Sequence, residues 1–280
     1  MAHTVEHGTH TLRAGSPTLS FALQRPPAST TATLRPRRAA LIAHPYGRLG
    51  GSKDDHVVRA LAELLADEGF LVVRFDARGA GESTGSTSWT GVAEAADFRE
   101  LVDDLVLPLL LPPPGAPSLL PSPPDDTASS TPYDLLLCGY SFGSLAASSC
   151  PPPAAPPSHP SAALRASYLL LSYPLSVLWA LTALHTAAPT SALRSLVAHG
   201  EARVLAVHGT EDDFSGVERL RGWAGELERV AAMEGRDGAW RAVEVEGADH
   251  FWRDRERKRE MLEAARSWVR EGLEASSRLE

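Results

Sequence analysis

The stretch that decides the fold is "LCGYSFGSLAA", residues 137–147, in which a single serine stands between two glycines. The apolar run "DLLLCG" leads into it and small residues follow, so the pattern predicts a strand, a tight turn and the start of a helix. Such a turn can hold Ser141 at its tip as a nucleophile. The pattern from Gly139 to Gly143 also occurs in ordinary turns, so the rest of the chain must decide between these interpretations.

Strand-like and helix-like stretches alternate on both sides of this turn. "RAALIAH" (38–44), "FLVVRFDA" (70–77) and "ARVLAVHG" (202–209) are typical of buried strands. "DDHVVRALAELLADEG" (54–69) has helical spacing, with acids at its start and a glycine at its end. The alternation predicts an α/β fold with a mainly parallel central sheet and helices on both faces, in a single domain over 1–280.

Two proline-rich stretches, at about 108–132 and 151–160, interrupt this alternation. Proline removes a backbone donor and fixes φ, so we expect Pro108 to interrupt the helix predicted over 92–110. For the same reason we expect both stretches to be surface insertions, outside the central strands. Docking of a proline-reading partner is the alternative interpretation.

Composition excludes several classes of function. With 27 Lys and Arg against 35 Asp and Glu, the formal net charge is −8, which argues against nucleic-acid binding. The N-terminus has no secretory-signal pattern, and no apolar run is long enough to span a bilayer, so a cytoplasmic protein is expected. Oligomeric state does not follow from the sequence.

The sequence predicts neither a cofactor nor a metal site. Cys138 and Cys150 are expected to be independent buried thiols. The N-terminal histidines, His3, His7 and His10, lie near a chain end where histidines usually ligate nothing. The glycines of "RFDARGAGES" lack the spacing of a nucleotide-binding loop.

An activated serine needs a base, and the base needs a group that orients it. His250 in "EGADHFW" lies between the last predicted strand and the last predicted helix, and Asp212 in "VHGTEDDF" directly follows an apolar strand. The carboxyl ends of parallel strands meet at one edge of the sheet, so we expect these residues to lie near Ser141. Asp213 is the alternative acid if the turn is shifted by one residue, and Asp249 is a weaker rival.

Five motifs together resemble the α/β-hydrolase superfamily. They are "HPYGRLGGSKDDHVV", "VVRFDARGAGESTG", "GYSFGS", "VHGTEDDF" and "GADHFW", which cover nearly the whole chain apart from the proline-rich insertions. More narrowly, the chain is similar to small, lid-poor serine hydrolases related to dienelactone hydrolases and acyl-peptidase-like enzymes. The resemblance implies an α/β-hydrolase fold with a short lid, with Ser141 as nucleophile, Asp212 as acid and His250 as base.

The segment "HPYGRLGG" resembles the loop that supplies one amide of the oxyanion hole. Pro45 has no N–H, so Tyr46 is the expected donor, with Gly47 as a substitute, and Phe142 should supply the second amide. We expect His44 to hold this loop in place and not to act as a base.

Other residues of these motifs receive structural roles. Arg78 and Glu82 are expected to brace loops beneath the pocket, and His208, inside a predicted strand, to be a packing histidine. The segment at about 172–199 lies where this fold often inserts a lid. Its candidates for lining a pocket are Leu175, Leu178, Trp179 and Leu184.

These features predict a cofactor-independent serine hydrolase that cleaves an ester, thioester or amide. The expected partner is a small-molecule acyl substrate of apolar character. Because fold does not determine function, a non-hydrolytic enzyme such as an acyltransferase or lyase is an alternative. A catalytically silent interaction protein that uses the proline-rich insertions is another.

Overall fold

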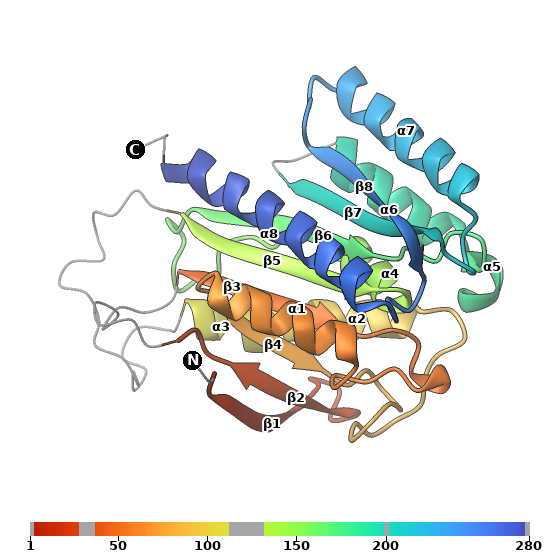
Figure 1. Ribbon diagram of the computed structural model, residues 1–280. Helices are drawn as coiled ribbons and strands as arrows, with labels where there is room; N and C mark the ends of the chain where they lie inside the picture. Colours follow the sequence, from red (N-terminus) through yellow and green to blue (C-terminus); the bar gives the residue numbers. More distant parts are fainter. Residues whose placement is uncertain (1–2, 28–36, 112–131, 199–201, 278–280) are drawn as a thin grey trace.

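The computed structural model describes residues 3–27, 37–111, 132–198 and 202–277. Eight strands form one sheet in the order β1-β2-β4-β3-β5-β6-β7-β8 (Figure 1). Pairing is antiparallel from β1 to β2 and from β2 to β4, and parallel for all other neighbours. The strands are β1 (Val5–Thr11), β2 (Thr18–Gln24), β3 (Arg38–Ala43), β4 (Leu71–Phe75), β5 (Tyr133–Tyr140), β6 (Leu164–Leu171), β7 (Arg203–Glu211) and β8 (Trp240–Asp249).

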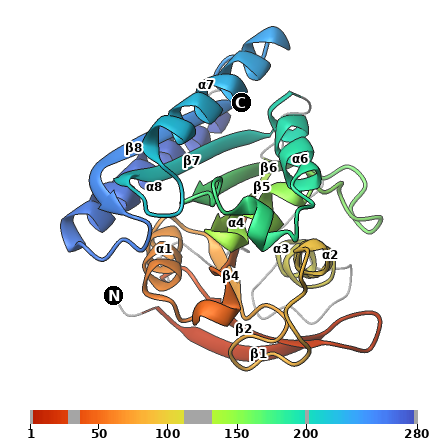
Figure 2. The ribbon, with the colours of Figure 1, turned by 90° about the vertical axis from the view of Figure 1, so that its right-hand side faces the viewer.

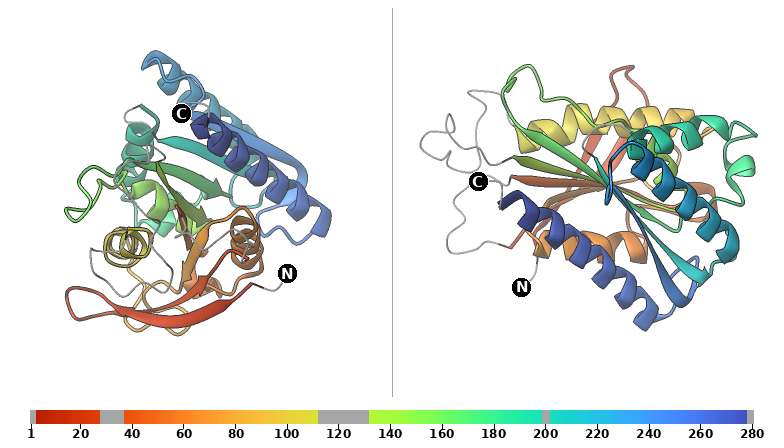
Figure 3. Two further views of the ribbon diagram at one scale, coloured as in Figure 1. Left: turned by 90° about the vertical axis from the view of Figure 1, so that its left-hand side faces the viewer. Right: turned by 90° about the horizontal axis from the view of Figure 1, so that it is seen from above.

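Helices cover both faces of the sheet, as Figure 3 shows from two directions. They are α1 (His56–Asp67), α2 (Val92–Leu101), α3 (Leu107–Leu110), α4 (Phe142–Ser149), α5 (Leu178–Leu181), α6 (Ala187–Ala198), α7 (Val217–Met233) and α8 (Arg255–Ser277), with the short turns η1 (Gly47–Leu49) and η2 (Val102–Val106). One face packs against α1 and α8, and the other against α2, α4, α6 and α7. The predicted α/β fold with a mainly parallel sheet is therefore confirmed.

The inner parallel strands β3 and β4 read as nearly continuous apolar runs because both faces of the sheet are covered there. Along β3, Ala39 and Leu41 belong to one core, and Ala40 and Ile42 belong to the core on the opposite face. Successive side chains of a strand point to opposite faces, so β4 and the stretch Ala39–Ala43 of β3 are buried at every position. This explains why strand and helix could be told apart by length and flanking residues and not by alternation.

The chain changes sides of the sheet between β3 and β5, which are neighbours. The helix after β3, α1, packs on one face, and the helix after β5, α4, packs on the other. In open α/β sheets such a switch point leaves a crevice at the carboxyl ends of the strands, where ligands bind. Figure 2 looks onto this edge of the sheet, which carries the loops after β3, β4, β5, β7 and β8.

The expected break at Pro108 is wrong. The chain remains helical through η2 and α3 to Leu110, with Pro108 in the first turn of α3. Because the chain is helical before and after it, Pro108 leaves one carbonyl of the preceding turn without a helical N–H partner. A π-helical turn, η2, precedes it and absorbs the change in hydrogen bonding.

The two proline-rich stretches are described unequally. Residues 112–131, most of the first stretch, lie outside the described residues. Residues 151–160 contain neither helix nor strand, and most of their side chains are exposed or half-buried. The segment at about 172–199 contains the single turn α5 and the longer helix α6.

The turn between β5 and α4 depends on two glycines. Ser141 has φ 53° and ψ −119°, a conformation that is strained for a residue with a side chain. A Cβ at Gly139 would lie 2.2 Å from the carbonyl oxygen of Gly143. A Cβ at Gly143 would lie 2.4 Å from the carbonyl oxygen of Ala43 and 2.7 Å from that of His44, because α4 begins against the end of β3.

Gly143→Ala is therefore expected to destabilise the protein by about 1–3 kcal/mol, the usual cost of overpacking a close contact. Chemical denaturation followed by circular dichroism measures the change. Gly222→Ala is the matched control, since nothing lies within 4 Å of its Cβ position inside α7, and it should leave stability unchanged or raise it by up to about 1 kcal/mol. Equal effects of the two substitutions would contradict the proposed contact.

Candidate active site

Three polar side chains meet at the carboxyl edge of the sheet, each directly after a strand. Ser141 follows β5, Asp212 follows β7 and His250 follows β8. The Nε2 atom of His250 lies 2.8 Å from Ser141 Oγ, and its Nδ1 atom lies 2.7 Å from Asp212 Oδ2. All three residues are buried. The structure thus brings Ser141, His250 and Asp212 into one hydrogen-bonded chain.

The Asp212 carboxylate is oriented by its own loop. Its Oδ1 atom accepts hydrogen bonds from the backbone amides of Phe214 at 2.8 Å and Ser215 at 2.9 Å, which leaves Oδ2 for His250. The neighbouring Asp213 is exposed. Of the two acids that the sequence left open, the geometry therefore favours Asp212.

The other rivals lie apart from this chain of hydrogen bonds. Asp249 accepts a hydrogen bond from the Arg253 guanidinium at 3.0 Å. His208 is buried in β7 with its Nε2 atom 3.8 Å from Glu244, and burial lowers the pKa of this histidine. This position agrees with the expected packing role of His208.

The backbone carbonyl of His250 accepts hydrogen bonds from two residues that were not predicted from the sequence. Its carbonyl oxygen accepts hydrogen bonds from the Tyr140 hydroxyl at 3.0 Å and the Ser172 hydroxyl at 3.3 Å. Trp252 Nε1 in turn donates to Ser172 Oγ at 2.9 Å. Tyr140 directly precedes Ser141, and Ser172 directly follows β6, so an inspection of strand ends would have pointed to both.

The two expected oxyanion donors lie on either side of the switch point. Phe142 begins α4, and Tyr46 lies in the loop after β3, directly before η1. The rings of these residues are in contact, with centroids 5.0 Å apart. In the described part of the chain, neither backbone amide donates a hydrogen bond to another protein group. Both amides are therefore available for a ligand near Ser141.

His44 has both ring nitrogens occupied. Its Nε2 atom accepts a hydrogen bond from the Ala77 amide at 2.9 Å, so Nδ1 carries the proton and donates it to the carbonyl oxygen of Pro45. Burial lowers the pKa of His44 and favours this neutral form. As expected, His44 fixes the loop and has no nitrogen free to act as a base.

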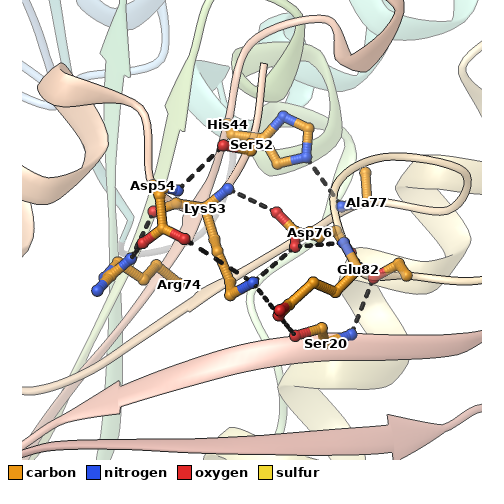
Figure 4. A network of polar contacts seen from close by, with 10 residues as sticks. Ser20, His44, Ser52, Lys53, Asp54, Arg74, Asp76, Ala77 and Glu82 are labelled. Atoms are coloured by element: carbon orange, nitrogen blue, oxygen red, sulfur yellow. Dashed lines mark hydrogen bonds and ion pairs between the residues drawn. The ribbon is translucent and has the colours of Figure 1, made fainter. Parts of the chain in front are cut away.

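The turn after β4 braces the surrounding loops. Arg78 pairs with Asp97 of α2. Glu82 accepts a hydrogen bond from Lys53 Nζ at 2.7 Å, as Figure 4 shows. These contacts agree with the expected roles of Arg78 and Glu82. Lys53 and its second partner, Asp76, were missed, although Asp76 follows the apolar strand β4 just as Asp212 follows β7.

A cavity of about 110 Å³ opens at Ser141. Its walls are mainly apolar and include Tyr46, Leu49, Phe214 and Phe251, and its lining contains no lysine or arginine among the described residues. Asp55 contributes the one carboxylate of this lining.

The lid-like segment at about 172–199 does line the cavity, but with other residues than the predicted ones. Val177 and Leu181 line the cavity. Leu178 is buried in the core instead and Leu175 packs against that core, whereas Trp179 and Leu184 are exposed. The reason is that α5 is a single turn, which presents fewer side chains to the site than the longer helix that the sequence permits.

A metal-like arrangement lies away from this site. His10, Glu100 and Asp104 form the one group of three potential ligands within 4.8 Å among the described residues. Arg13 pairs with the Asp104 carboxylate, and its amide donates to Glu100. The Asp104 carboxylate is therefore already paired with a cation of the protein, and Glu100 already accepts a backbone hydrogen bond. Of the helices in the described part of the chain, none combines the length and apolar character needed to cross a bilayer.

One family model matches part of the chain. The model of the X-Pro dipeptidyl-peptidase (S15) family matches residues 18–106, a stretch that ends before Ser141. No protein of curated function matches the sequence.

Solved structures resemble the chain over almost its whole length. An Agrobacterium tumefaciens α/β hydrolase of unknown function is 17% identical, with a TM-score of 0.64, covering 96% of this chain and 97% of its own. A Xanthomonas campestris α/β serine hydrolase without a lid is 19% identical, with a TM-score of 0.59 and coverage of 97% and 94%. A Pyrococcus furiosus esterase is 14% identical, with a TM-score of 0.62 and coverage of 96% and 93%. The chain has the α/β-hydrolase fold, as its resemblance to that superfamily predicts.

Proposed function

We propose that the protein is a serine hydrolase that cleaves esters through a covalent acyl-enzyme intermediate. One observation carries this proposal: Ser141 Oγ, both ring nitrogens of His250 and Asp212 Oδ2 form a continuous chain with contacts of 2.8 and 2.7 Å. A hydroxyl, an imidazole and a carboxylate in this order are the parts of a Ser-His-Asp triad.

In the first half of the reaction, Ser141 Oγ attacks the ester carbonyl carbon while His250 Nε2 takes the hydroxyl proton. Asp212 holds the imidazole in the required tautomer and stabilises the imidazolium that forms. The tetrahedral intermediate then breaks its bond to the alcohol oxygen, which receives the proton from His250. In the second half, water attacks the acyl-enzyme with His250 again as base, and this step releases the acid and restores Ser141.

The negative charge that develops on the carbonyl oxygen requires hydrogen-bond donors. The unpartnered amides of Tyr46 and Phe142 are the proposed donors, and the start of α4 adds its favourable dipole. Each such donor typically contributes about a hundred- to a thousandfold in rate.

The cavity supports a short, uncharged acyl substrate. Its volume of about 110 Å³ is small compared with the roughly 300–1,000 Å³ of pockets that hold drug-sized ligands. The Asp55 carboxylate in its lining, without a lysine or arginine among the described lining residues, disfavours an anionic substrate. An ester is favoured over an amide because its carbonyl is less stabilised by resonance, and because an alcohol oxygen needs less assistance from the His250 proton to depart than an amide nitrogen does.

Aromatic side chains flank the position of the departing alcohol. The leaving oxygen must come within reach of His250 Nε2 to receive its proton. The Phe214 ring lies 4.5 Å and the Phe251 ring 5.4 Å from the His250 ring, centroid to centroid, and both line the cavity. We therefore assign the alcohol part of the substrate to this side and expect it to be apolar or aromatic.

The proposal is tested with p-nitrophenyl esters of graded chain length. Activity should be highest for acetate to butyrate and fall for octanoate, because a longer chain exceeds the cavity. Ser141→Ala should lower kcat by about a thousandfold or more. Retention of hydrolysis by Ser141→Ala would falsify the assignment of the nucleophile, and equal rates on an X-Pro p-nitroanilide would overturn the preference for esters.

The two neighbouring acids provide a matched pair. Asp212→Ala should lower kcat by about a thousand- to ten-thousandfold, because His250 loses the group that fixes its tautomer. Asp213→Ala, which changes an exposed carboxylate one residue away, should leave kcat within about twofold. Steady-state kinetics, normalised to sites labelled by a fluorophosphonate, measure both effects. Reversed effects would assign the acid to Asp213.

Phe214→Ala should weaken selection of the alcohol and not of the acyl group. We expect the ratio of kcat/KM for 2-phenylethyl acetate to that for ethyl acetate to fall about three- to tenfold, since an aromatic contact contributes about 1 kcal/mol. Phe214→Leu, which keeps an apolar wall, is the control and should lose less. If the ratio for acetate against butyrate changes instead, the two sides of the site have been assigned the wrong way round.

A further inference from the structure

A buried ion pair lies beneath the proposed oxyanion loop and has no part in the reaction described above. Lys53 is 2% exposed and Asp76 is 1% exposed, with Lys53 Nζ 2.8 Å from Asp76 Oδ2 (Figure 4). Burying two charges costs solvation energy that their attraction repays only in part. The pair therefore needs an explanation other than stability alone. Neither residue lines the cavity at Ser141, so direct contact with substrate does not supply one.

The Asp76 carboxylate collects donors from two loops. It accepts hydrogen bonds from the Lys53 amide at 2.7 Å and from the Glu82 amide at 3.0 Å, in addition to Lys53 Nζ. A Cβ at Gly81 would lie 2.2 Å from Asp76 Oδ2, so the turn over residues 79–82 packs tightly against the carboxylate. This packing leaves little freedom for the Asp76 side chain.

Both ends of the loop that carries Tyr46 are attached to the end of β4. At its entrance, His44 Nε2 accepts a hydrogen bond from the Ala77 amide at 2.9 Å. At its exit, the Lys53 amide donates to Asp76. The two anchors, Asp76 and Ala77, are consecutive residues. Between the two attachments the loop closes on itself, because the Gly51 amide donates to the Tyr46 carbonyl at 3.2 Å.

Further contacts keep Lys53 in this position. Arg74 donates to the Lys53 carbonyl at 2.7 Å and pairs with Asp54, and Glu82 accepts from Lys53 Nζ. Burial by itself would lower the pKa of Lys53, but the hydrogen bonds to Asp76 and Glu82 outweigh burial and raise that pKa. The ammonium group therefore stays charged at neutral pH.

We propose that Lys53 and Asp76 are positioning residues, whose buried ion pair clamps residues 44–53 so that the Tyr46 amide faces the carbonyl oxygen that Ser141 attacks. This inference rests on the proposed function for its kinetic consequence. A misplaced oxyanion donor weakens binding of the transition state and leaves binding of the ground state largely unchanged. Loss of the clamp should therefore lower kcat and leave KM nearly constant.

Lys53→Met, which keeps the length of the side chain and removes its charge, is the primary test. We expect kcat per fluorophosphonate-titrated site on p-nitrophenyl acetate to fall about ten- to a hundredfold, with KM changed less than threefold. The Ki of a trifluoromethyl ketone, whose adduct with Ser141 bears an oxyanion, should rise by the same factor. A loss of thermal stability with kcat per site and Ki within twofold of the wild type would overturn the proposal.

Two further variants separate positioning from general stability. In the double variant Lys53→Met with Asp76→Asn, no unpaired charge remains buried, so part of the lost kcat should return relative to Lys53→Met. Arg78→Met breaks a comparable ion pair of the same turn, whose partner is the buried Asp97 of α2 and not a residue of the loop over 44–53. It should lower stability and leave kcat per site within about threefold. An equal loss of kcat in Arg78→Met would contradict a specific role for Lys53.

Amide hydrogen exchange supplies a readout that does not depend on catalysis. In Lys53→Met, peptides covering residues 45–52 should exchange at least tenfold faster, whereas those covering 139–147 should be unchanged. Unchanged exchange over 45–52 would overturn the clamp whether or not the protein hydrolyses esters. If the wild type cleaves no ester while exchange responds as expected, the proposed function fails and the clamp stands.

Discussion

The close approach of α4 to the end of β3 is the constraint on which the candidate site depends. Gly143 lies so near the carbonyl oxygens of Ala43 and His44 that only a hydrogen fits in place of a side chain. This contact brings the start of the helix after β5 against the loop after β3, and therefore Phe142 against Tyr46. The strained φ of Ser141 follows from the same turn, because the chain must reverse within one residue to begin α4 there.

Each of the three residues that meet at the candidate site is also held by hydrogen bonds to groups outside this set of three. Two amides hold Asp212, and two hydroxyls hold the carbonyl of His250. The backbone amide of Ser141 donates to the Leu171 carbonyl of the neighbouring strand at 2.8 Å. Ser141 and His250 lie 109 residues apart in the sequence, but their side chains are in contact at 2.8 Å. The contact is maintained because both residues follow strands that end at the same edge of one sheet.

The sequence contained enough to predict the order of strands and helices and the three residues that meet, because these depend on local patterns. A glycine-flanked serine, a carboxylate at a strand end and a histidine before the last helix are each recognisable within a few residues. Lys53 is different, since its partner lies 23 residues away and a Ser-Lys-Asp-Asp run has the composition of an exposed surface. Pro108 was misjudged because tolerance of proline depends on the preceding π-helical turn, which no local pattern announces.

The buried ion pair also explains how the loop proposed to carry an oxyanion donor is held in place. Residues 47–51 contain three glycines, so apolar packing of side chains can fix only part of this loop. Directional hydrogen bonds to backbone amides define the position of a main-chain segment without needing side chains on it. A buried carboxylate offers such bonds at full strength, but its charge must be balanced, and Lys53 supplies both the balancing charge and one of the bound amides. The hydrogen bonds of this buried pair therefore hold the glycine-rich loop in one conformation, and the desolvation of the two charges is the cost of that arrangement.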